Sequence, residues 1–114
     1  MIRRVVAVKL KEAYSNPDDR AVAAGHTREV LAAAPGVREI EVDTPADVPT
    51  ERSWDFLILL SFDSMAAVEE YRAHPLHRQY MDVFLRPMLK VIKVWNFEQL
   101  ETPPYLKGLP RCTS

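Results

Sequence analysis

The sequence predicts a single α+β domain in which an antiparallel four-stranded sheet carries helices on one face. Four segments have the β-branched or alternating apolar pattern of strands, and two others open with residues typical of helix N-termini. In chain order these segments read β-α-β-β-α-β, which is the split βαβ arrangement of ferredoxin-like folds. A chain of 114 residues is long enough for one hydrophobic core and too short for two.

The first half of the chain supplies two strands and the helix between them. Valines dominate the first strand, and the second alternates apolar with charged residues. Asn16 is suited to cap the helix, Pro17 to occupy its first position, and Pro35-Gly36 to end it. The expected elements are a strand over residues 2–11, a helix over 17–34 and a strand over 37–43.

The second half begins with a proline-containing, charged segment that we expect to be an exposed loop. Asp63-Ser64 caps a helix, which breaks at His74-Pro75 because proline pushes the preceding residue out of the helical region. The expected elements are a loop over 44–53, a strand over 54–62, helices over 65–73 and 75–85, and a strand over 89–97. The domain then spans residues 1–100, and residues 101–114, with three prolines, form a tail without regular structure.

Both faces of the expected sheet carry apolar side chains, although helices cover only one. The helix-facing side of the last strand is assigned Leu89, Val91, Trp95 and Phe97. The uncovered face is assigned Val5, Ala7, Leu57, Leu59, Ile92 and Val94. A patch of this kind requires a partner, and the simplest closure is a homodimeric α+β barrel made from two identical sheets. The alternative is that the C-terminal tail folds over this face.

The bulk composition narrows the class of partner. The net charge of −1 favours neither a nucleic acid nor an anionic membrane surface. No run approaches the roughly 18 apolar residues of a membrane helix. Cys112 is the lone cysteine, so an internal disulfide is impossible. We therefore expect a cytoplasmic protein whose partners are a second copy of itself and a small molecule.

Tyr71 and His77 are the candidate catalytic residues. An imidazole titrates near neutral pH, so His77 could take a proton from a carbon next to a carbonyl. Tyr71, across the helix break, could donate a hydrogen bond to that carbonyl as it becomes an enolate. The alternative for His77 is a buried histidine satisfied by a backbone carbonyl. For Tyr71 it is a core aromatic whose hydroxyl reaches the surface.

Arg4 places a cation among apolar residues on the helix-facing side of the first strand. At the rim of a cavity between sheet and helices it could bind a carboxylate or phenolate, whereas the alternative is a surface arginine at a strand end. Further candidates for substrate binding, all of which would also suit the core or a helix cap, are Val6, Val8, Phe56, Ile58, His74, Tyr80, Met81 and Phe84.

The sequence lacks the common cofactor and metal motifs. It contains no glycine-rich phosphate loop, no Cys/His zinc pattern and no nucleophile elbow. His74 and His77 have no third ligand nearby, so we expect no metal site. Any chemistry is therefore expected to proceed without a cofactor.

The segment FDSMAAVEEYRAHPLH at residues 62–77 resembles the centre of the stress-responsive dimeric α/β-barrel (Dabb) family. The opening IRRVVAVKLK at 2–11 and the PGV at 35–37 are also similar to the family, and the resemblance covers about residues 2–98. It implies a homodimer whose sheets face each other, with a separate cavity between sheet and helices in each subunit.

The resemblance extends to olivetolic acid cyclase-like members of the family, which close a linear polyketide by an intramolecular aldol condensation. Their essential tyrosine and histidine match Tyr71 and His77, while two further pocket histidines fall at Arg4 and Phe56. The resemblance therefore implies a cofactor-independent cyclase, or a related lyase or isomerase, for a small and largely apolar carbonyl compound. The alternatives are a non-catalytic, stress-responsive ligand-binding homodimer and a cofactor-free oxygenase of the wider dimeric α+β barrel group.

Overall fold

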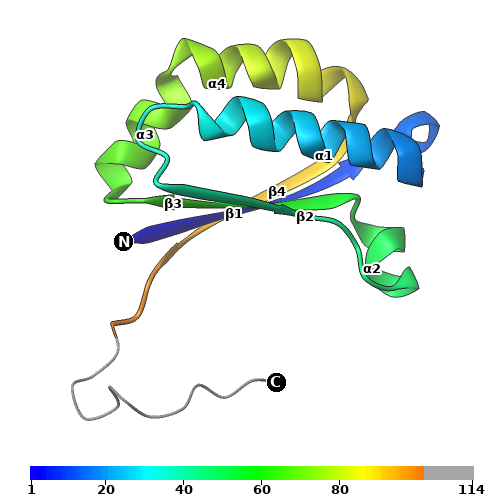
Figure 1. The fold of residues 1–114 in the computed structure, drawn as a ribbon, viewed down its shortest axis with the longest axis horizontal. Coiled ribbons are helices and arrows are strands. Elements are labelled where there is room, and N and C mark those ends of the chain that lie inside the picture. The colour runs from blue at the N-terminus through cyan, green and yellow to red at the C-terminus, as the bar shows by residue number, and fades with distance from the viewer. Residues whose placement is uncertain (102–114) are drawn as a thin grey trace.

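A four-stranded antiparallel sheet carries helices on one face (Figure 1). The computed structural model describes residues 1–101. Its elements are β1 (Ile2–Leu10), the 3-10 turn η1 (Glu12–Tyr14), α1 (Pro17–Ala32), β2 (Glu39–Asp43), α2 (Val48–Ser53), β3 (Phe56–Phe62), α3 (Met65–Ala73), α4 (Pro75–Gln79), the π-helical turn η2 (Tyr80–Leu85), the 3-10 turn η3 (Arg86–Met88) and β4 (Leu89–Glu98). The predicted tail over 101–114 lies outside the described residues from position 102 onward.

The sheet order is β2-β3-β1-β4, with the N-terminal strand between the third and the last. This order confirms the predicted ferredoxin-like fold. Val6 pairs with Ile58 on β3 and with Val94 on β4, so these three residues lie in one row across the sheet. Because side chains alternate along a strand, the register also fixes which residues face the helices.

The helix starts follow the caps that the sequence predicts. The Asn16 side chain accepts a hydrogen bond from the Asp19 N–H at 2.9 Å, and the Ser64 hydroxyl accepts one from the Ala67 N–H at 3.2 Å. The chain leaves α1 through Gly36, whose φ of 84° favours glycine. No helix within residues 1–101 has the length and apolar character needed to cross a bilayer.

The core lies between the helix-covered face of the sheet and the helices. Its largest fully buried apolar side chains come from β1, β3, α1, α3 and η2. They are Val8, Leu10, Leu31, Phe56, Leu60, Phe62, Val68, Tyr71 and Leu85. Burying a large apolar side chain stabilises a fold by roughly 1.5–3 kcal/mol, so this layer is the main source of stability.

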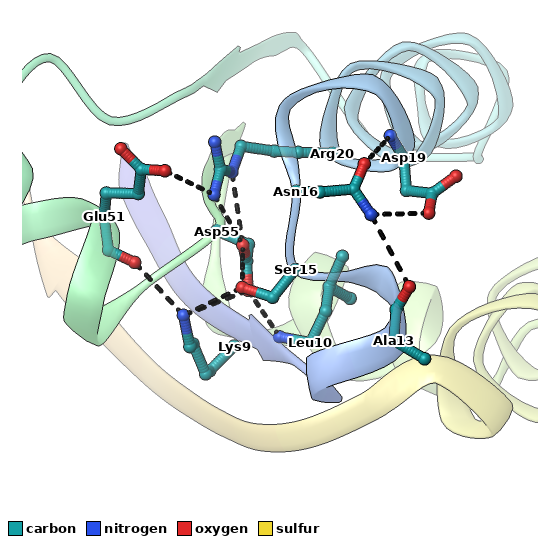
Figure 2. Close-up of polar contacts among 9 residues, drawn as sticks. All are labelled: Lys9, Leu10, Ala13, Ser15, Asn16, Asp19, Arg20, Glu51 and Asp55. Atoms are coloured by element: carbon teal, nitrogen blue, oxygen red, sulfur yellow. Dashed lines mark hydrogen bonds and ion pairs between the residues drawn. The ribbon is translucent and has the colours of Figure 1, made fainter.

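A buried polar cluster closes one end of the molecule (Figure 2). Asp55, with no exposed surface, accepts hydrogen bonds from the Leu10 N–H at 2.7 Å and the Ser15 hydroxyl at 2.8 Å. Its carboxylate also accepts from the Arg20 guanidinium at 3.0 and 3.2 Å, and the Lys9 ammonium lies 3.6 Å away. The cluster therefore ties the end of β1 and the start of α1 to the residue that precedes β3.

The loop expected over residues 44–53 contains a helix, so that prediction was wrong. Asp47 caps α2 by accepting from the Thr50 N–H at 2.9 Å, and Pro49 lies in its first turn. Trp54 ends α2 instead of starting the next strand, which begins at Phe56. A helix of six residues is too short to show an apolar period, so only its cap could have marked it.

The faces predicted for the last strand were also wrong. Lys9 pairs with Val91 but Leu10 pairs with Leu89, so Lys90 is an extra residue that forms a β-bulge. The bulge separates Leu89, which packs against the core, from Val91. Ile92 and Val94 pair with Val8 and Val6 and therefore face the helices. The residues of β4 on the opposite face are Val91, Lys93, Trp95 and Phe97.

The sheet face without helices is apolar in its centre. We call it the open face and define it by Val5, Leu57, Leu59, Val91, Trp95 and Phe97. Trp95 and Phe97 are 45% and 56% exposed, which is unusual for such large apolar side chains. The expectation of an apolar uncovered face holds, although the residues that β4 contributes to it differ from those predicted.

Candidate functional site

A cavity of about 210 Å³ lies between the helix-covered face of the sheet and the broken helix. Strands β1, β3 and β4 form its floor, and α3, α4 and η2 supply most of its roof. The lining residues are Arg4, Val6, Leu31, Ile58, Leu60, Tyr71, Arg72, His77, Tyr80, Met81, Leu85, Ile92 and Val94. Apolar side chains thus surround a few polar groups, as is typical of small-molecule sites.

Tyr71 projects from the last turn of α3 into this layer and is almost fully buried. Its ring centroid lies 5.0 Å from that of Phe62 and 4.6 Å from that of His77. Within residues 1–101 the structure gives its hydroxyl no hydrogen-bond partner. Every fully buried side-chain oxygen or nitrogen of these residues has a partner, so the Tyr71 hydroxyl retains some accessible surface, and Tyr71 lines the cavity. Burial raises the pKa of Tyr71 far above its usual range, so the hydroxyl keeps its proton.

His77 lies on α4, where the Arg72 carbonyl fixes its ring. The His77 Nδ1 is 3.2 Å from that carbonyl oxygen, which can only accept a hydrogen bond. The neutral ring therefore carries its proton on Nδ1 and a lone pair on Nε2. Burial lowers the pKa of His77, and the positive charges of Arg4 and Arg72 lower it further. The hydrogen bond with the Arg72 carbonyl and the negative charge of Asp82 act in the opposite direction, but the net shift of the pKa is downward.

The helix break brings Tyr71 and His77 together. His74 has an extended backbone with a ψ of 138°, and its Nδ1 accepts a hydrogen bond from the Leu76 N–H at 3.1 Å. Pro75 then starts α4, and α4 continues into the π-helical turn η2. An unbroken α-helix would place residues six apart on different sides, because each residue advances by about 100°. The break instead leaves both rings in contact.

Arg4 is the buried cation of the cavity. Its side chain comes from β1, is 7% exposed, and donates from a terminal nitrogen to the Asn96 Oδ1 at 3.0 Å. Arg4 and Asn96 are direct partners in the β1–β4 register, so the sheet itself sets this contact. Burial lowers the pKa of Arg4, but an arginine remains charged at any physiological pH.

Four more of the predicted binding residues line the cavity: Val6, Ile58, Tyr80 and Met81. Tyr80 is buried and its hydroxyl lies 2.5 Å from the Thr27 hydroxyl of α1. Burial raises the pKa of Tyr80 to about 12. Because its hydroxyl is already paired, Tyr80 contributes mainly its ring to the wall.

Four other predicted binding residues lie outside the cavity. Phe56 and Val8 pair with each other farther along the strands, where Phe56 borders a different hollow that includes Trp54. His74 caps α4 with its ring nitrogen. Phe84 packs against His26 of α1, with ring centroids 4.2 Å apart. Residue type and strand parity could not reveal these placements, because they depend on distance along the sheet and on the π-helical turn.

The sequence did not single out Arg72 or the aliphatic wall formed by Leu31, Leu60, Leu85, Ile92 and Val94. It also did not single out Asn96, which contacts Arg4. The available signal for Asn96 was a polar residue two positions after Val94 on the same face of β4. Within residues 1–101, no group of three or more His, Cys, Asp or Glu side chains is arranged to hold a metal ion.

The comparisons with known proteins agree with this architecture. No curated protein matches the chain. A Dabb family protein from Mesorhizobium loti is 22% identical with a TM-score of 0.74, covering 88% of this chain and 97% of its own. A dimeric ferredoxin-like protein from Thermobifida fusca is 19% identical with a TM-score of 0.71, covering 86% and 90%.

A third solved structure is of a protein from Deinococcus radiodurans, named as a candidate antibiotic biosynthesis monooxygenase. It is 17% identical with a TM-score of 0.66, covering 90% of this chain and 96% of its own. At these identities the solved structures show the fold. The family model of the Stress responsive A/B Barrel Domain, however, matches residues 2–99, and the chain therefore belongs to the Dabb family.

Proposed function

We propose that this protein is a cofactor-independent acid–base catalyst, a polyketide cyclase-like enzyme or a related lyase or isomerase, for a small and largely apolar carbonyl compound. The observation that carries the proposal is the pairing of Tyr71 and His77 in one apolar cavity, with ring centroids 4.6 Å apart. At neutral pH the Tyr71 hydroxyl keeps its proton and the His77 ring is uncharged, with a free lone pair on Nε2, as an acid–base pair requires.

The proposed step is enolisation. His77 Nε2 takes a proton from the carbon next to a carbonyl, while the Tyr71 hydroxyl donates a hydrogen bond to the carbonyl oxygen as negative charge develops there. In a cyclisation the enolate carbon would form a bond with a second carbonyl carbon of the same molecule, whose oxygen would take up a proton. In an isomerisation the proton would return to another carbon.

We further propose that the protein is a homodimer that pairs through its open face. The exposed Trp95 and Phe97 support this proposal, as does the description of the Thermobifida fusca neighbour as dimeric. The cavity lies on the opposite side of the same sheet, so pairing would leave it accessible.

The second candidate is a homodimer that binds a ligand in this cavity without converting it. The cavity supports binding as well as catalysis, because most of its lining is apolar. Oxygenase activity rests on the name of the Deinococcus radiodurans neighbour, and 17% identity supports the fold alone. The two candidates differ in one measurable property: a catalyst would remove a proton from the carbon next to the carbonyl of the bound compound, and a binding protein would not.

The test is hydrogen–deuterium exchange at the carbon next to the carbonyl of one-ring ketones such as acetophenone. In D₂O the wild-type protein should accelerate exchange, which NMR follows directly. His77→Ala should slow the catalysed exchange by about 10²–10⁴-fold, the usual worth of a general base. Tyr71→Phe should slow it less and keep the fold. Arg28→Gln, on the exposed side of α1, is the control and should match wild type. Ketone binding without acceleration would favour the ligand-binding candidate.

A further inference from the structure

We infer that Arg4 and Asn96 form a carboxylate-binding site inside the cavity, so that the ligand is a small acid with one ring or an equally short apolar body. The carboxylate is inferred from the charge and contacts of Arg4 alone. That this acid is also the compound on which Tyr71 and His77 act rests on the proposed function.

The partners of Arg4 are the first argument. A buried charge is costly unless it is paired, and the described residues offer this guanidinium one neutral amide oxygen, at 3.0 Å from Asn96. No carboxylate of residues 1–101 forms an ion pair with it. A guanidinium has five N–H donors, and this contact uses one. The remaining N–H donors belong to a side chain that lines the cavity.

The other buried arginine shows what a satisfied site looks like in this protein. Arg20 is as buried as Arg4, and it contacts the Asp55 carboxylate at 3.0 Å and the Glu51 carboxylate at 3.4 Å. It closes the polar cluster at the end of the sheet (Figure 2). The structural arginine, Arg20, therefore has acidic partners. Arg4 lines a cavity instead.

The other arginine that lines the cavity, Arg72, is already paired. It lies 3.3 Å from the Glu69 carboxylate. Both side chains of this pair are exposed, so water also screens it. An incoming anion would therefore be held more strongly by Arg4, which is buried and has no carboxylate of residues 1–101 within ion-pair distance.

The size of the cavity limits the rest of the ligand. An apolar cavity of about 150 Å³ in another protein holds benzene. A cavity of about 210 Å³ has room for one ring and a small polar group. The apolar walls at Val6, Ile58 and Ile92 line the same sheet face as Arg4. A carboxylate on Arg4 would therefore place the apolar body against these walls and below Tyr71 and His77.

Matched acid and amide pairs test the inference without requiring a substrate. The probes are benzoate with benzamide and phenylacetate with phenylacetamide, which differ in charge but hardly in shape. Methyl NMR of Val6, Ile58 and Ile92 reports on the cavity, and the exposed Val22 of α1 is the remote reference. The acids should shift the cavity methyl signals and bind about 10- to 100-fold more tightly than the amides, as expected for a hydrogen bond to a charged group.

Variants of Arg4 test whether this residue causes the preference for acids over amides. Arg4→Gln should abolish it, whereas Arg28→Gln removes an exposed positive charge and should preserve it. If Arg4→Gln does not fold, Arg4→Lys keeps the charge without the planar fork and should retain a reduced preference. Equal binding of acids and amides to wild type, an unchanged preference in Arg4→Gln, or no shift of the cavity methyls would overturn the inference. Tyr71→Phe should keep the acid preference whether or not it loses exchange activity, so the two proposals fail separately.

Discussion

At the scale of single residues, the contact between His77 and the Arg72 carbonyl matters most for the proposed chemistry. It fixes the tautomer, and burial keeps the ring neutral. Burial raises the pKa of Tyr71, because it disfavours the charged phenolate, so the hydroxyl stays protonated. The same cavity thus holds one group ready to accept a proton and the other ready to donate a hydrogen bond. This division of roles needs no further ionisable residue.

The pKa of His77 predicts the acid limb of the rate profile. A base is lost when it is protonated, so the exchange rate should fall as pH drops through the pKa of His77. Because burial lowers that pKa from the ordinary 6.5, the midpoint should lie below this value. Exchange rates measured across the acidic range provide the check. A midpoint at or above 6.5, or the same limb for residual activity in His77→Gln, would contradict the assignment.

Asp55 is the residue on which we expect stability to depend most. Asp55→Ala would remove the fully buried partner of Arg20 and leave this buried guanidinium with the half-exposed Glu51 carboxylate, at 3.4 Å, as its one acidic partner among residues 1–101. Breaking a buried ion pair in this way typically costs about 3–5 kcal/mol. Urea unfolding should show this loss, whereas Asp63→Ala, which breaks the exposed pair with Arg38, should lose much less. Equal losses in the two variants would argue against a structural role for the cluster.

Acid sensitivity follows from the same residue. Burial alone would raise the pKa of Asp55, but the hydrogen bonds from Leu10, Ser15 and Arg20 outweigh it and lower the pKa below the ordinary 3.8. A lowered folded-state pKa means that the contribution to stability is complete above the unfolded-state pKa. It is lost as pH falls from about 4 toward the folded-state pKa.

At the scale of elements, β4 decides which side chains serve the cavity and which serve the open face. The extra residue Lys90 shifts the register, after which Ile92, Val94 and Asn96 face the helices. Trp95 and Phe97 face away from them. One edge strand therefore contributes the amide that holds Arg4 and the large apolar side chains that we expect to contact a second subunit.

Trp95→Glu should separate the subunits. It would place a charge in the centre of an apolar interface, where each buried side chain otherwise contributes roughly 1.5–3 kcal/mol. Light scattering should give about twice the chain mass for wild type and a single chain mass for the variant. Leu59→Glu, on the same face, should act alike, and Val22→Glu on the exposed side of α1 should remain dimeric. A wild-type monomer at micromolar concentration would contradict the proposed assembly.

Much of the fold could be predicted because its signals are local. Caps at Asn16 and Ser64, the break at Pro75 and the alternation of β3 each need only a few neighbouring residues. The β-bulge could not be predicted, because a single extra residue leaves no composition signal. The role of Asp55 was equally hidden, since its hydrogen-bond partners lie 35 to 45 positions earlier in the sequence.

The candidate site was predictable in its polar members and less so in its walls. Tyr71, His77 and Arg4 stand out by residue type and line one cavity. Phe56 and Phe84 have equally suitable side chains but lie elsewhere, because strand parity gives a face and not a position along it. Whether an aromatic residue packs in the core or borders a cavity depends on where the helices leave space.

At the scale of the whole molecule, the sheet separates two tasks. Its helix-covered face holds the cavity with Arg4, Tyr71 and His77, and its open face presents Trp95 and Phe97. Changes on one face should therefore leave the other intact. Dissociating variants that remain folded should keep the acid preference of the cavity, and cavity variants should remain dimeric.

The most direct test of the central claim is a double-mutant cycle of deuterium exchange with wild type, Tyr71→Phe, His77→Ala and the double variant. If the two residues act on one carbonyl as a unit, their effects are not independent. We expect each single variant to slow the catalysed exchange and the double variant to be little slower than His77→Ala alone. Single variants as fast as wild type, or losses that multiply in the double variant, would contradict an acid–base pair in this cavity.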